Sequence, residues 1–178
     1  GCILEALRIN RRPASPSLLE ELMTKKAAAY LTSIKDHLVI FPGVREFIEA
    51  AAAAYPIAIA SGALRPEIEL VLEQIGIRKA FGHFTSAEAV TCGKPNPEPF
   101  LQALAGLNRH QSMAAISPDA CLVIEDSLPG IRAAKAAGMK VLAVANTHTI
   151  QDLHEADAIS SSLSETRLKD LRARLWPT

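Results

Sequence analysis

The spacing of hydrophobic residues changes near residue 56 of the chain. Before that point they recur every three or four residues, which gives an α-helix one apolar face. The positions are Leu19, Leu22, Met23, Ala27, Tyr30, Leu31 and Ile34 in one segment, and Val44, Phe47, Ile48, Ala51 and Ala52 in the next. We predict a long helix that starts with a capping box at Ser17 and Glu20 and ends near His37. A second helix begins at Val44.

Beyond residue 56, short apolar runs alternate with helical patterns. Strands are predicted at 57–60, 83–86, 121–126, 141–144 and 158–159, with helices at 66–76, 100–107, 129–138 and 163–175. We expect the proline-rich loop 91–99 to be non-helical. Strand and helix units joined by short loops favour right-handed crossovers and a parallel sheet covered on both faces. The predicted fold is therefore α/β, with three layers.

Composition narrows the functional classes. Nineteen basic residues balance nineteen acidic ones, and no basic stripe with aromatic residues is present, so nucleic acid is not an expected partner. No apolar run reaches the roughly 18 residues that a membrane span needs, and no signal peptide is visible. Cys2, Cys92 and Cys121 lie far apart, which indicates reduced thiols and a cytoplasmic protein. The oligomeric state is not readable from the sequence.

Two adjacent acids, Glu125 and Asp126, follow the apolar run from Cys121 and precede Pro129 and Gly130. The pattern is typical of a buried parallel strand that ends at the sheet edge where open α/β proteins bind ligands. Neighbouring carboxylates repel each other unless a cation lies between them, and oxygen ligands suit Mg²⁺. We predict a magnesium site at these acids. The alternative is that they only cap the following helix.

Two other loops carry residues that suit a phosphate. Ser61-Gly62-Ala63 follows a predicted strand, so its hydroxyl and N–H groups would lie at a helix N-terminus, where anions bind. Lys94 lies in a loop with three prolines in five residues, which stiffen the backbone. Taken singly, Ser61 is also typical of a serine that only caps a helix or stabilises a turn. Lys94, taken singly, is also typical of a surface lysine with a solvated ammonium. Together with the acids they fit a phosphoryl group, which requires charge neutralisation and positioning.

These motifs, taken together, resemble motifs two, three and four of the haloacid dehalogenase-like hydrolases. The matching segments are Ser61, Gly93 to Phe100, Val123 to Gly130 and Ala133 to Gly138. The chain most resembles the branch of β-phosphoglucomutase-like phosphatases with a helical cap, and the turn from Phe41 to Val44 resembles that branch's return from cap to core. The resemblance implies the C-terminal part of an α-helical cap at 1–40 and a Rossmann-like core at 41–178.

The resemblance also implies a role for the phosphate-binding residues. Ser61 would hydrogen-bond the phosphoryl oxygens, with help from the backbone of Gly62 and Ala63. Lys94 would neutralise charge on the nucleophile and the phosphate, and Asn96 would lie near the mouth of the site.

For the acids, the resemblance implies that Asp126 binds Mg²⁺ and that Glu125 is a second or water-mediated ligand. Arg65 occupies a position where the branch often has a basic residue.

One motif of the family is absent. Its nucleophile and general acid/base are two aspartates, two residues apart, at the end of the first strand. This chain has no Asp before Asp36 and no Asp-x-Asp motif. The absent strand would lie between the strands at Ile57 and Leu122, and each buried backbone group left unpaired there would cost about 1–3 kcal/mol. We expect the segment to exist upstream in the intact protein. The alternative is a naturally truncated, inactive chain.

The function that the resemblance implies is Mg²⁺-dependent hydrolysis of a small phosphorylated metabolite through an aspartyl-phosphate, with the nucleophile upstream of this fragment. One alternative is a sugar-phosphate mutase of the β-phosphoglucomutase type, which returns the phosphoryl group to the substrate. A second is a catalytically inactive relative that binds a phosphorylated ligand or a partner protein.

Overall fold

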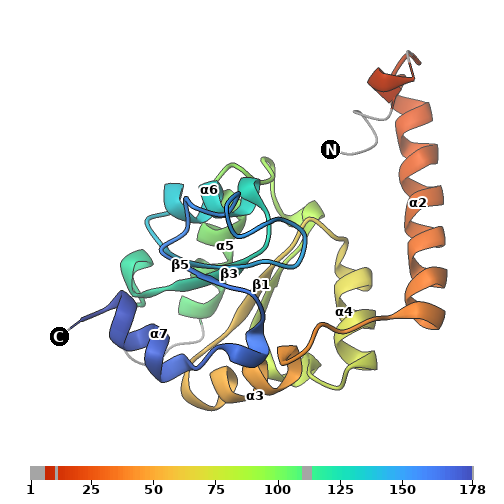
Figure 1. Ribbon diagram of the computed structural model, residues 1–178. Helices are drawn as coiled ribbons and strands as arrows, with labels where there is room; N and C mark the ends of the chain where they lie inside the picture. The colour runs from red at the N-terminus through yellow and green to blue at the C-terminus, as the bar shows by residue number, and fades with distance from the viewer. Residues whose placement is uncertain (1–6, 11, 110–113, 178) are drawn as a thin grey trace. The chain divides into compact units, whose positions relative to one another are not determined.

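The computed structural model describes residues 7–10, 12–109 and 114–177. The chain divides into two compact units, Gly1–Val39 and Ile40–Thr178 (Figure 1). Helix α2 (Pro16–His37) is the main element of the first unit. Its N-cap is Ser15, whose side chain accepts a hydrogen bond from the backbone N–H of Leu18. The predicted capping box at Ser17 is therefore wrong, because Pro16 already occupies the first helical position, where its missing N–H costs nothing.

Part of the predicted apolar face of α2 lies outside the described side chains. The positions concerned are Met23, Ala27, Tyr30, Leu31 and Ile34. The backbone of the helix is described at all of them.

The second unit has the predicted alternation of strands and helices. Its elements are α3 (Val44–Ala54), β1 (Ala58–Ala60), α4 (Arg65–Gln74), β2 (His83–Thr85), α5 (Glu98–Asn108), β3 (Leu122–Glu125), α6 (Leu128–Ala136), β4 (Lys140–Val144), β5 (Ala158–Ser160) and α7 (Leu168–Leu175). Strand β1 pairs in parallel with β2, and β3, β4 and β5 pair in parallel in that order. These pairings confirm the predicted α/β class.

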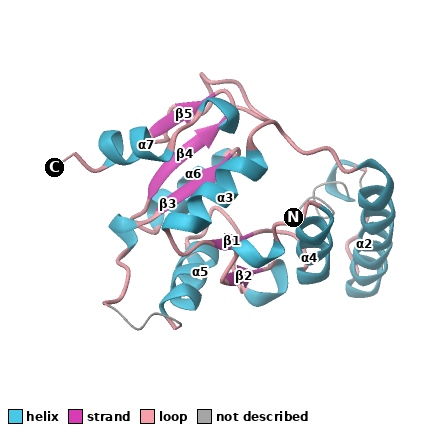
Figure 2. Cartoon of the chain, turned by 90° about the horizontal axis from the view of Figure 1, so that it is seen from below, coloured by secondary structure: helices cyan, strands magenta, loops and turns pink. Residues whose placement is uncertain are grey.

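Helices cover both faces of the three-stranded sheet. Phe100 of α5 and Ile131 of α6 belong to one buried cluster, which Val141 of β4 also joins. Phe47 of α3 and Leu171 of α7 belong to a second cluster. Figures 1 and 2 show α5 and α6 on one side of the strands and α7 on the other. The unit therefore has three layers, as predicted.

Across residues 7–10, 12–109 and 114–177, no strand pairing joins the two sheets to each other. Among the described residues no strand lies between β1 and β3. All three residues of β1 are only partly buried, and Ile124 in the middle of β3 exposes 40% of its surface. The carboxyl ends of β1 and β3 are nevertheless close to a shared core, because Ala60 packs against the cluster that contains Phe100 and Val123.

Two predicted boundaries are wrong. Helix α5 begins at Glu98, inside the loop 91–99 that we expected to be non-helical, because Pro99 falls in the first turn, where proline is tolerated. The predicted helix 163–175 is a 3₁₀ turn (Leu163–Glu165) followed by α7. The hydroxyl of Ser162 accepts from the backbone of Ser164, and such side-chain bonds compete with a continuous helix.

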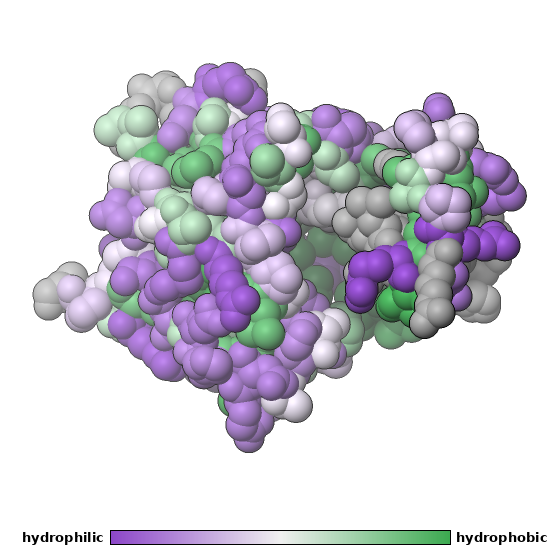
Figure 3. All heavy atoms as spheres, turned by 90° about the horizontal axis from the view of Figure 1, so that it is seen from above, coloured by the Kyte–Doolittle hydropathy of each residue, from purple (hydrophilic) through white to green (hydrophobic). Residues whose placement is uncertain are grey.

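The surface of the second unit is mainly hydrophilic in the view of Figure 3, with small hydrophobic areas between hydrophilic ones. Within the described parts of the chain, no helix combines the length and the apolar character that crossing a membrane requires.

Candidate active site

Ser61 lies at the carboxyl end of β1 and extends its pairing with β2, since its backbone N–H donates to the carbonyl of Thr85 at 2.9 Å. The Ser61 hydroxyl oxygen accepts from the N–H of Ala63 at 3.1 Å. Its proton is therefore available for an incoming oxygen. A Cβ at Gly62 would meet no atom within 4 Å, so the backbone of this turn borders open space.

Lys94 lies in a turn in which the N–H of Asn96 donates to the carbonyl of Gly93 at 3.1 Å. The Lys94–Pro95 peptide bond in this turn is cis. The ammonium forms an ion pair with the carboxylate of Glu125 and lies 4.8 Å from the centre of the Phe100 ring. The side chain of Lys94 is only 22% exposed. The loop thus brings the predicted lysine to the carboxyl end of β3.

The carboxylate of Glu125 is buried against the N-terminus of α6. Its Oε1 accepts from Lys94, and its Oε2 accepts from the hydroxyl of Ser127 at 2.9 Å and from the backbone N–H groups of Asp126 and Ser127. A Cβ at Gly130 would lie 2.1 Å from the carboxyl carbon of Glu125. Only a glycine therefore leaves room for this carboxylate. The N-cap of α6 is Ser127 rather than either acid.

Two side chains in the loop that follows β4 form hydrogen bonds with Asp126. The hydroxyl of Thr147 lies 3.0 Å from both the Oδ2 and the carbonyl oxygen of Asp126, and the Nδ1 of His148 lies 3.0 Å from the same carbonyl. Because a carbonyl only accepts, the His148 Nδ1 carries the proton of that bond. The Oδ1 of Asp126 has no hydrogen-bond partner among the described residues.

Thr147 and His148 are not among the residues predicted from sequence. Both follow the predicted strand at 141–144, and the carboxyl ends of neighbouring parallel strands share one sheet edge. That placement is the signal that could have found them.

Two further predicted residues have structural partners. The Oδ1 of Asn96 accepts from the N–H of Glu98 at 2.9 Å and so helps to close the loop. Arg65 begins α4, where its Nε donates to Glu69 at 3.2 Å and its guanidinium lies 5.5 Å from the Phe84 ring centre. The phosphate-binding role of Asn96 stays a prediction.

The acids fit a hard cation in their chemistry. Asp126 offers a free oxygen, whereas both oxygens of Glu125 already accept hydrogen bonds. In the described residues no three His, Cys, Asp or Glu side chains group closely enough to hold a metal. Mg²⁺ commonly binds one or two carboxylates, water and substrate phosphate, so Asp126 suits one position of such a site.

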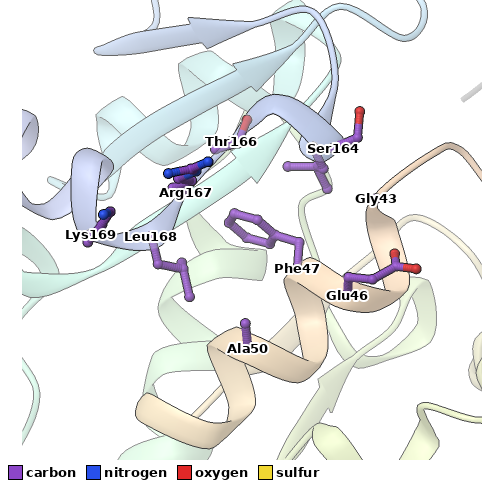
Figure 4. Close-up of a pocket in the computed structure, with 10 residues that line it drawn as sticks. Gly43, Glu46, Phe47, Ala50, Ser164, Thr166, Arg167, Leu168 and Lys169 are labelled. Atoms are coloured by element: carbon purple, nitrogen blue, oxygen red, sulfur yellow. The ribbon is translucent and has the colours of Figure 1, made fainter.

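A groove of about 550 Å³ lies elsewhere, between α3 and the segment 163–169 (Figure 4). Phe47 and Leu168 point into it, and Arg167 and Lys169 lie along one side. None of the predicted site residues lines this groove.

The arrangement at the strand ends thus joins Lys94 directly to Glu125 and places Asp126 beside them. A model of the haloacid dehalogenase-like hydrolase family matches residues 5–138. The chain belongs to this family. Its members are hydrolases by the description of that model, and the resemblance identified from motifs two to four is confirmed.

Individual relatives are phosphatases. The chain is 35% identical over 137 residues to a bifunctional riboflavin kinase/FMN phosphatase of Arabidopsis thaliana, a match that covers 75% of this chain and 34% of that protein. It is 29% identical to hexitol phosphatase B of Escherichia coli K12, covering 90% of this chain and 71% of that protein. The chain thus spans about a third of the first relative's length.

A crystal structure of β-phosphoglucomutase from Clostridium difficile has the same fold. It superposes with a TM-score of 0.82 at 24% identity, covering 95% of this chain and 73% of that one. This likeness confirms the Rossmann-like fold.

Proposed function

We propose that the intact protein is a Mg²⁺-dependent phosphatase of small phosphorylated metabolites, and that Ser61, Lys94 and Asp126 form part of its active site. The observation that carries this proposal is the contact of Lys94 with the acid end of β3. An ammonium fixed beside carboxylates is suited to neutralise a phosphoryl group rather than to serve as a solvated surface charge. The FMN and hexitol phosphatases among the relatives favour a phosphomonoester substrate.

Each residue would contribute a separate part of the chemistry. Ser61 would donate its free hydroxyl proton to a phosphoryl oxygen, and the backbone of Gly62 and Ala63 would let that oxygen approach closely. Lys94 would place its positive charge beside the transferring group. Bound Mg²⁺, held in part by Asp126, would supply further charge neutralisation. Asn96 is proposed at the mouth of the site and Glu125 as a second or water-mediated metal ligand.

The nucleophile is proposed to be an aspartate on a strand that lies between β1 and β3. Among the described residues each of these two strands has one unpaired side, and this observation and the exposure of Ile124 support the position. Such a strand would pair with both sheets and bring its own carboxylates to the edge where Asp126 lies.

We propose that residues 1–40 are part of a helical cap that closes over the site, and that the protein acts in the cytoplasm. Cys92 and Cys121 are free thiols, which suits a reducing compartment.

The test is a phosphate-release screen on the intact protein with and without Mg²⁺. We expect turnover only with the metal, and a decrease in kcat/KM of about 10²–10³-fold in Lys94→Ala and in Asp126→Ala with an unchanged circular dichroism spectrum. Lys79→Ala is the control for loss of a positive charge and should keep full activity.

The screen also separates the other candidate functions. Interconversion of sugar phosphates without net phosphate release would identify a mutase instead. An intact protein that binds inorganic phosphate but turns over no phosphomonoester would overturn the enzymatic proposal.

A further inference from the structure

A single carboxylate closes the base of the turn that carries Lys94. The two oxygens of Glu98 accept from the backbone N–H groups of Thr91 and Cys92, each at 2.8 Å. Gln102, one helical turn along α5, donates to the same carboxylate at 3.0 Å. Glu98 therefore ties the segment that enters the turn to the first turn of α5.

The segment that leaves the turn is tied to the same residue. The backbone N–H of Glu98 donates to the side chain of Asn96 at 2.9 Å, and the N–H of Asn96 donates to the carbonyl of Gly93 at 3.1 Å. These bonds enclose Lys94 on both sides. The orientation of the turn is thereby fixed relative to α5, which also supplies the Phe100 ring beneath the ammonium.

We propose that Glu98 is a positioning residue that acts through Lys94, by holding the turn so that the ammonium reaches the phosphoryl site. The proposal rests on the proposed function. Lysine is a flexible point charge, so its position depends on the backbone that carries it, and a displacement near 1 Å at a reacting group can cost about 100-fold in rate. Without the carboxylate, the N–H groups of Thr91 and Cys92 lose their acceptors and the turn is no longer fixed.

The charge state of Glu98 is consistent with this role. The hydrogen bonds from Thr91 and Cys92 lower the pKa of the Glu98 carboxyl below its usual value. The residue is thus ionised, and able to accept both bonds, at neutral pH.

A purely structural role for Glu98 would be to stabilise the N-terminus of α5 as an acid in its first turn. Glu46 is likewise an acid in the first turn of its helix, α3, and no ion pair of its side chain is found within the described part of the chain. Glu46→Ala is therefore the matched control for loss of a first-turn acid.

The first experiment is a double-mutant cycle with Lys94 in the intact protein. Glu98→Ala should lower kcat/KM about 10- to 100-fold, whereas Glu46→Ala should leave it unchanged. The variant that combines Glu98→Ala with Lys94→Ala should be no less active than Lys94→Ala alone, because both changes remove the same interaction. Losses that multiply, or full activity in Glu98→Ala, would overturn the proposal.

The second experiment does not depend on turnover. In the folded protein the Phe100 ring should shift the ε-methylene NMR signals of Lys94, because the Nζ lies 4.8 Å from the ring centre. In Glu98→Ala we expect these signals to move toward their unstructured values and the amide protons of Thr91 and Cys92 to exchange faster. Unchanged Lys94 signals would overturn the proposal even in an active enzyme. If the intact wild type released no phosphate but Glu98→Ala caused these changes, the proposed function would fail, whereas the positioning of Lys94 by Glu98 would stand.

Discussion

The two sheets of the α/β unit differ in how completely their strands are buried. Strand β4 has a neighbour on each side, and its residues from Val141 to Val144 are at most 2% exposed. In the part of the chain that the structure describes, strand β1 pairs only with β2, and each of its residues is partly exposed. Both strands are short apolar runs, so the difference does not arise from composition. The number of paired strands is not the whole cause, because Phe84 and Thr85 of β2 are buried although β2 pairs with β1 alone in the described residues. An apolar run predicts a strand, but the elements packed around it decide its burial.

The proposed active site draws on both sheets. Ser61 comes from the end of β1, which pairs with β2, whereas the acid pair comes from the end of β3, which pairs with β4. Side chains at the end of the three-stranded sheet already have partners in Lys94 and Thr147. The turn after β1 borders open space. The three-stranded sheet should therefore be the more sensitive to substitution.

The largest contrast is expected between Leu142 and Ile124. Leu142 is 1% exposed in β4, so Leu142→Ala should lower the free energy of unfolding by about 3–5 kcal/mol, whereas Ile124→Ala should cost about 1 kcal/mol because that side chain is 40% exposed. Urea unfolding of the 178-residue chain, followed by the fluorescence of Trp176, measures both. Equal losses would show that the open side of β3 is covered in solution.

A smaller contrast is expected between two glycines at the strand ends. Gly130→Ala places a Cβ against the buried carboxylate of Glu125 and should cost about 1–3 kcal/mol in unfolding free energy. Gly62→Ala meets no neighbouring atom and should change stability by less than about 0.5 kcal/mol. If a phosphate approaches the backbone at this turn, however, Gly62→Ala should raise KM. An unchanged KM would remove Gly62 from the proposed site.

The sequence predicts most of the framework. The alternation of apolar runs and helical patterns gives every strand of the described unit to within one or two residues. It succeeds best where glycine ends a helix before the next element, as at Gly76 and Gly138, which adopt positive φ at the helix ends. It fails where polar side chains compete with the backbone, as at Ser162, or where a proline starts a helix instead of preventing one, as at Pro99.

The site is less completely predictable. Lys94 stands out because prolines stiffen the loop that carries it, and Glu125 and Asp126 stand out as two adjacent acids at the end of an apolar run. Thr147 and His148 do not stand out, since a threonine and a histidine in a loop have no distinctive spacing. The sequence places them after the predicted strand at 141–144, but their contacts with Asp126 depend on the pairing of β3 with β4, which the structure shows.

A third contrast concerns ion pairs. Asp157, just before β5, accepts from the ammonium of Lys135 at 2.7 Å and from the backbone N–H of Val141 at 2.8 Å. It thereby ties α6 and β4 to the start of β5. Asp157→Asn keeps one acceptor but loses the charge, and we expect a loss of about 1–2 kcal/mol in unfolding free energy at pH 7. Glu73→Gln, at an exposed acid of α4 that has no ion pair among the described residues, serves as the control.

The same pair predicts a pH dependence. Burial raises the pKa of the Asp157 carboxyl, but the bonds from Lys135 and Val141 outweigh it, so the pKa lies below the ordinary value of 3.8. A lowered folded-state pKa stabilises the protein above the unfolded value and loses that contribution as the pH falls through the folded value. The difference in stability between wild type and Asp157→Asn should therefore be constant above about pH 5 and shrink below pH 4. A difference that persisted into stronger acid would contradict this account.

The smallest effect is expected for the ion pairs beside the two-stranded sheet. Glu69 accepts from Arg65 and from Arg78, each at 3.2 Å, but its side chain is 32% exposed and both guanidinium groups also lie over the Phe84 ring. Glu69→Gln keeps the size of the side chain and an acceptor, so the loss should be below about 1 kcal/mol and should weaken further in 1 M salt. Unfolding in urea at low and high salt measures it. A loss as large as that of Asp157→Asn would mean that β1 and β2 depend on their surface charges as strongly as β4 and β5 depend on a partly buried carboxylate.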